Sequence, residues 1–90
     1  MQSPETAAKL AEIVAIYDTT GADNLFPSAA RDIAASAGRE ADYWQALLDD
    51  RQTMRNLSNY VGAHETAVIQ AYRAVQIAWL AVADRLGGDA

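Results

Sequence analysis

The sequence predicts an all-α fold, a three- to four-helix bundle with a long C-terminal helix, formed by residues 1–90 as a single helical domain. Large apolar residues recur between 64 and 86 at alternating spacings of four and three, as in a helix that packs one seam against its neighbours. No apolar–polar alternation of useful length, the pattern of a β-strand, occurs in the 90 residues. Hydrophobic residues make up 51% of the chain, which is well above the content of a disordered chain.

The first helix is predicted to begin at Ser3 and to run to about Thr19. Ser3 suits the N-cap position and Pro4 the first helical position. An apolar face follows at helical spacing, formed by Leu10, Ile13, Val14 and Tyr17. Gly21 can adopt a positive φ and is expected to end this segment.

A linker over 22–27 precedes a short second helix, predicted over 29–37. Leu25 and Phe26 are apolar, and we expect them to plug the end of the core. Gly38 is expected to stop the short helix. The inward residues of this helix are predicted to be Ile33, Ala34 and Ala37.

A third helix is predicted to begin near Arg39, and Arg51 is the one charge on its apolar stripe. The stripe comprises Tyr43, Trp44, Leu47, Leu48, Met54, Leu57 and Val61. One interpretation of Arg51 is a site for an anion or a partner carboxylate, continued by the polar side chains of Arg55, Asn56, Tyr60 and His64. The simpler interpretation is an ion pair between Arg51 and an acid of another helix. Residues 59–62 are either a break before the last helix or a kink within one long helix.

The last helix, predicted over 64–86, carries more apolar circumference than a small core can cover. Its seam comprises Val68, Tyr72, Val75, Trp79, Val82 and Leu86, beside an alanine series at 67, 71, 74, 78 and 81. Ile77 and Leu80 fall on the remaining polar side. Exposed apolar side chains there are typical of an oligomer or partner interface. The predicted partner-binding residues are Arg51, Arg55, Tyr60, Tyr72, Arg73, Ile77 and Leu80.

Composition excludes several classes of function. The chain has no cysteine, which excludes disulfides, zinc–thiolate sites and thiol catalysis. Its formal net charge of -5 repels phosphate backbones and argues against nucleic-acid binding. The N-terminal residues show no signal-peptide pattern, and the most apolar window, 67–83, is too short and too polar for a membrane span. We therefore expect a cytoplasmic protein.

Catalytic and metal sites are poorly supported by the residue pattern. The only histidine, His64, has no Ser or Asp at a spacing that marks a partner, and we expect it to be a partly exposed residue of a first helical turn. A helical di-metal site needs inward carboxylates with an E-x-x-H pair. The acids Glu12, Asp18, Asp42, Asp49 and Asp50 lack that pairing. We predict no catalytic residue, no cofactor and no metal.

A helix-turn-helix is one alternative for residues 34–47. Ala34, Gly38, Trp44 and Leu47 fit its pattern of a small residue, a turn glycine and two apolar anchors. Arg39 stands where that motif usually has an apolar residue. The second helix of the pair also carries several acids, which disfavours DNA binding.

Residues 44–51, WQALLDDR, resemble the W-x-x-[ML]-L-[DE]-D-R motif of HEPN proteins that pair with minimal nucleotidyltransferases. The Pro-Ser run-in at 27–28 and the last-helix opening at 65–67 follow the order of that family. The resemblance covers about half the chain and implies a helical subunit of a toxin–antitoxin-type pair. Nuclease-type members carry R-x4-H, whereas Asn56 stands at that distance from Arg51, so the nuclease motif is incomplete here.

These observations together predict a non-enzymatic helical module for protein–protein interaction. It is expected either to self-associate as a homo-oligomer or to dock on a partner protein through its helix faces.

Overall fold

The computed structural model describes residues 3–55 and 62–87 of the chain. Three α-helices and one short 3-10 helix make up the fold, and no strand occurs in the described residues, so the all-α prediction is confirmed. The elements are α1 (Pro4–Ile16), η1 (Ala22–Asn24), α2 (Pro27–Arg55) and the long C-terminal α3 (Ala63–Gly87).

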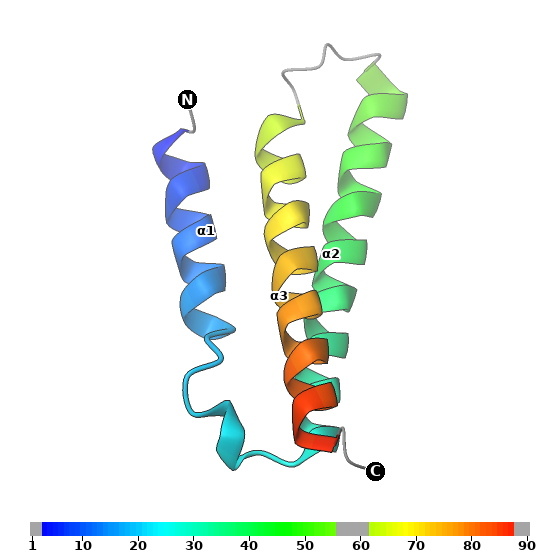
Figure 1. The fold of residues 1–90 in the computed structure, drawn as a ribbon. Coiled ribbons are helices and arrows are strands. Elements are labelled where there is room, and N and C mark those ends of the chain that lie inside the picture. Colours follow the sequence, from blue (N-terminus) through cyan, green and yellow to red (C-terminus); the bar gives the residue numbers. More distant parts are fainter. Residues whose placement is uncertain (1–2, 56–61, 88–90) are drawn as a thin grey trace.

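The helices form one layer with α3 in the middle and α1 and α2 on either side (Figure 1). The molecule measures 49 × 25 × 13 Å, and its radius of gyration is 15.3 Å. A compact domain of this length has a radius of gyration of about 12 Å. The chain is therefore flatter and more extended than a compact domain, and less of its surface is covered.

The start of α1 follows its prediction, but the helix ends earlier than expected. The Ser3 side chain accepts a hydrogen bond from the Thr6 backbone N–H at 3.1 Å, as an N-cap does. The helix ends at Ile16 rather than near Thr19. Beyond it, the Asp18 carboxylate accepts hydrogen bonds from the backbone N–H and the hydroxyl of Thr20, and such side-chain bonds compete with a helix.

The predicted stop at Gly38 is wrong, because α2 runs without interruption through this residue. Gly38 is buried, and a Cβ built on it would lie 2.5 Å from the side-chain nitrogen of Gln76 on α3. The glycine therefore provides room for close packing of α2 on α3 rather than a turn. The boundaries predicted for two separate helices, 29–37 and one from Arg39 onward, are corrected to one helix. Because α2 is continuous over residues 34–47, these residues do not form a helix-turn-helix.

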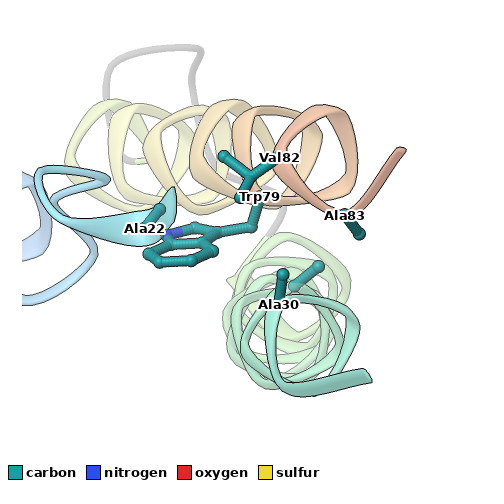
Figure 2. Close-up of a cluster of buried hydrophobic side chains, with 6 residues drawn as sticks. Ala22, Ala30, Trp79, Val82 and Ala83 are labelled. Carbon is teal, nitrogen blue, oxygen red and sulfur yellow. The ribbon is translucent and has the colours of Figure 1, made fainter. Parts of the chain in front are cut away.

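The prediction for the loop before α2 is also wrong. Phe26 is 78% exposed and Leu25 is 37% exposed, so neither plugs the core. Ala22, in η1, is buried there instead and packs against Trp79 of α3 (Figure 2). Gly21 has a φ of 79°, the positive value expected from the sequence, and it turns the chain into η1.

The core consists of two clusters of buried side chains, which lie one after the other along α3. Around Trp79 lie small residues that let the indole reach between η1 and α2 (Figure 2). Its Nε1–H donates a hydrogen bond of 2.8 Å to the Tyr17 backbone carbonyl, which ties the end of α1 to α3. The second cluster comprises Ile13, Ala41, Val68 and Tyr72. The predicted burial of Ala34 and Ala37 is confirmed, while Ile33 is half-buried.

Val14 and Tyr43 were predicted to face the core, but both are mostly exposed. In so flat a fold, α1 and α2 pack mainly against α3, and side chains that point away from these contacts have no further helix to cover them. The alanine series of α3 divides in the same way. Ala71 is half-buried against the second cluster, whereas the alanines at 74, 78 and 81 are exposed.

The chain reverses direction between α2 and α3, which lie side by side and antiparallel (Figure 1). The two segments are therefore separate helices, and the kink in one long helix is excluded. Residues 59–61, where the break was placed, lie outside the described residues.

By length and composition, α3 is the one described helix that reaches the threshold for crossing a membrane, with a mean hydropathy of 1.2 over 18 residues. The window 67–83, predicted to be too short and too polar, lies within this longer helix of 25 residues. Core helices reach the same threshold. Val68 and Trp79 of α3 are buried between its neighbours, and 33% of the 18-residue window lies inside the fold.

Burial of Tyr72 makes stability sensitive to alkaline pH. Burial, with a contribution from Glu40, raises the Tyr72 pKa above the ordinary value of 10.0, and Lys9 opposes the shift only in part. Above pH 10 the unfolded chain therefore loses this proton before the folded chain does, and the free energy of unfolding falls as pH rises. We expect urea unfolding between pH 9 and 11 to show a smaller fall in a Tyr72→Phe variant. Equal falls in both proteins would contradict this assignment.

Candidate functional site

The exposed side of α3 carries four residues at spacings of four, three and four, and we name these the α3 outer face: Arg73, Ile77, Leu80 and Asp84. This spacing places all four on one stripe of the helix. Ile77 is 67% exposed and Leu80 is 44% exposed, which is unusual for apolar residues in the central helix of a fold. The structure thus places two of the predicted partner-binding side chains next to each other on an uncovered face.

The charged ends of the α3 outer face have different surroundings. Arg73 donates a hydrogen bond of 2.6 Å to the Asp42 carboxylate on α2 and contacts the Gln76 side chain at 3.4 Å. Asp84 is exposed, and no ion pair joins it to another residue in the part of the chain that the structure describes. The order of the stripe along α3 is therefore positive, apolar, apolar, negative.

A second exposed apolar pair lies on α2, although the sequence pattern predicted that both of its members face the core. Tyr43 and Leu47 are four residues apart, and the exposed acids Glu40 and Asp50 lie three residues beyond them on either side. We name these four residues the α2 outer face. No local signal separated this pair from the core, because Tyr43 and Leu47 have the same helical spacing as Trp44 and Leu48.

Arg51 forms an ion pair with the buried carboxylate of Glu65 in the first turn of α3. The simpler interpretation of Arg51, an internal ion pair with an acid of another helix, is therefore confirmed. The pair joins the far end of α2 to the start of α3. Its carboxylate also lies near the positive end of the α3 dipole, which favours negative charge.

The remaining predicted partner-binding residues are not brought to one surface. Tyr72 is only 6% exposed and packs edge-to-face on Tyr17, with 6.1 Å between ring centroids. It belongs to the core because its position on α3 faces α1, and its assignment to a partner surface is corrected. Arg55 is the last residue of α2, and Tyr60 lies outside the described residues.

An open cleft of about 330 Å³ lies between α1 and the other two helices. It is lined by Glu5, Ala8, Lys9, Glu12, Trp44 and His64. The Lys9 ammonium lies 5.9 Å from the centroid of the Trp44 ring and 3.7 Å from the Glu12 carboxylate. The cation in the cleft is therefore already engaged by side chains of the same chain.

His64 lies in the first turn of α3 and is half-buried, as expected, but it has a partner that the sequence did not reveal. Its Nδ1 lies 2.6 Å from the Thr6 hydroxyl of α1, which also accepts a hydrogen bond from the Ser3 hydroxyl at 2.9 Å. The Thr6 hydroxyl therefore links the Ser3 side chain to the imidazole of His64. Fifty-eight residues separate Thr6 from His64, so no local pattern marked the pair.

This hydroxyl–imidazole pair joins α1 to the first turn of α3. A serine or threonine nucleophile needs both a base within hydrogen-bond reach and access to its substrate. Thr6 is buried and does not line the cleft, whereas His64 does. Within the described residues, no group of three or more His, Asp or Glu gathers as metal ligands do.

Replacement of Thr6 by valine tests this role. Valine keeps the shape of the side chain but removes the hydroxyl, so His64 Nδ1 and the Ser3 hydroxyl lose their partner. We expect the free energy of unfolding to fall by about 1–3 kcal/mol, measured by urea unfolding. Thr6→Ser, which retains the hydroxyl, is the matched control and should recover most of the loss. Equal stability of the valine and serine variants would show that the hydrogen bond contributes nothing.

Comparison with known protein families, with curated proteins and with solved structures found no match to this chain.

Proposed function

We propose that the chain is a non-enzymatic module for protein–protein interaction that contacts its partner through the α3 outer face. The observation that carries this proposal is the exposure of Ile77 and Leu80, adjacent on the helix that forms the centre of the fold. Exposed apolar residues adjacent on one face, with charged residues beside them, are typical of interaction surfaces.

The total accessible surface supports the proposal. It amounts to 6119 Å². A compact monomer of 9.7 kDa exposes about 5,100 Å². The chain therefore exposes more surface than a compact monomer of its mass, as expected of a flat arrangement of helices.

The arrangement of charges favours a role in protein–protein contact over a catalytic role. Three arginines, at 51, 73 and 85, pair with acids of other elements, and Lys9 pairs with Glu12 on α1. The three arginines join different elements of the fold, the Lys9–Glu12 pair lies within α1, and none of these four cations is directed at an enclosed site. The cleft beside α1 is open, and its one histidine is already hydrogen-bonded through Nδ1.

Site-specific photo-crosslinking tests the proposal in the cells that encode the chain. A benzophenone amino acid at position 77 should form protein adducts, either with the same chain or with another protein. The matched control is position 14 on α1, because Val14 is 63% exposed, close to the value for Ile77. Adding Leu80→Asp should abolish the adducts formed at position 77. Absence of adducts, or equal adducts at both positions, would contradict a contact through this face.

A further inference from the structure

We infer that the occupant of the α3 outer face is a second copy of this chain, placed antiparallel across a two-fold axis. This inference rests on the proposed function and specifies its partner. It is carried by the order of charges on the stripe and by the shape of the surface around Ile77.

The stripe is complementary to itself in one direction only. Its order is Arg73, Ile77, Leu80, Asp84, positive at one end and negative at the other. In an antiparallel pair with the axis between 77 and 80, Arg73 meets Asp84 of the second copy while Ile77 meets Leu80. Two-fold symmetry makes each of these contacts twice. A parallel pair would set arginine against arginine and aspartate against aspartate.

The surface around Ile77 permits close approach of a second helix. The residues three before and four after it on α3 are Ala74 and Ala81, and both are exposed. Small residues beside a large apolar one form the type of shallow hole into which a facing side chain packs. Arg73 already pairs with Asp42 of α2, so in the dimer its guanidinium group would be shared between two carboxylates.

The α2 outer face shows why the second copy is assigned to α3. Its apolar pair, Tyr43 and Leu47, is flanked by Glu40 and Asp50. Two such faces bring acid against acid in either direction, and the chain as a whole carries a net charge of -5. A face with its own positive charge favours self-association of an acidic chain, and the α3 outer face carries Arg73 on the same stripe as Asp84.

Cysteine pairing tests both the contact and its direction, because the natural chain has no cysteine. Two variants, Arg73→Cys and Asp84→Cys, are prepared separately and then mixed before oxidation with copper phenanthroline. In the antiparallel pair, 73 and 84 face each other, whereas 73 and its own copy lie about 16 Å apart along the helices. A disulfide needs Cα atoms within about 7 Å. The mixture should form a cross-linked dimer, and neither variant should do so alone.

The other outcomes overturn the inference and separate it from the proposed function. Cross-linking of Arg73→Cys with itself would show a parallel pair, so the inference would fail while contact through the face remained. Absence of cross-links together with a monomeric natural chain in sedimentation experiments at about 1 mM would exclude a second copy. Photo-crosslinking at position 77 to a different protein would then still support the proposed function.

Charge reversal gives a second readout that does not depend on a disulfide. Asp84→Arg should weaken the dimer about tenfold or more, because it sets two guanidinium groups against each other at each end of the contact. The double variant Arg73→Asp with Asp84→Arg exchanges the charges and should restore the dimer. Thermal melting of each variant checks that Arg73→Asp, which removes the pair with Asp42, leaves the monomer folded. A dimer dissociation constant that is unchanged by Asp84→Arg alone would overturn the assigned pairing.

Discussion

Replacing Trp79 with alanine is expected to lower the free energy of unfolding by about 3–5 kcal/mol. The indole is 4% exposed and fills the space between η1 and α2, against Ala22 and Ala30 (Figure 2). Its Nε1–H also bonds the Tyr17 carbonyl at 2.8 Å. Since small domains are stable by only about 5–15 kcal/mol, this single change should leave the chain close to unfolding at ordinary temperature.

Circular dichroism during urea unfolding measures this loss. Trp79→Phe is the matched control, because phenylalanine retains much of the volume but cannot donate the hydrogen bond. We expect it to fall between the natural chain and the alanine variant. The same alanine change at Ile77, which is exposed, should alter stability by less than about 0.5 kcal/mol. If Trp79→Ala were no more destabilising than Ile77→Ala, the assignment of this cluster as the core would be wrong.

Removal of Arg51 is expected to have the second largest effect, about 3 kcal/mol. Its partner Glu65 is buried, with 8% of its side chain exposed, and an Arg51→Met variant would leave that carboxylate without an opposite charge. Arg51 itself is partly exposed, so water reaches the pair and the cost lies at the lower end of the range for buried ion pairs. Thermal and urea unfolding both report this cost.

A double-mutant cycle separates the coupling between Arg51 and Glu65 from the cost of leaving one charge buried without its partner. We expect Arg51→Met combined with Glu65→Leu to be close to the natural chain in stability, because two apolar side chains replace two charges. The single change Arg51→Met should therefore be the less stable of the two variants. Additive effects of the two single changes would show that Arg51 and Glu65 are not coupled.

The sequence predicted those elements whose signals are local. The Ser3 cap, the apolar seam of α3 and the inward alanines at 34 and 37 all depend on spacing within one helix. The internal ion pair of Arg51 was also expected, because a charge within an apolar stripe needs a partner nearby. The exposure of Ile77 and Leu80 followed from counting the apolar circumference of α3 against the size of the core.

The errors arose where a contact between distant segments decided the outcome. Gly38 indicates a turn when it is read alone, and only the approach of Gln76 from α3 shows that it makes room inside a helix. Likewise, Phe26 and Tyr43 are apolar enough for a core, but a single layer of helices has no second layer to cover them. The bond between Thr6 and His64 joins residues 58 positions apart, so helical periodicity contains no information about it.

The middle position of α3 restricts how its length can change. One residue inserted near its centre would rotate everything after it by about 100°, since the helix has 3.6 residues per turn. Trp79 would then leave its place beside Ala22, and the contacts that the second half of α3 makes with η1 and α2 would be lost together. Length variation in descendants of this chain is thus expected to accumulate in its connections, while α3 keeps a constant number of residues between Glu65 and Trp79.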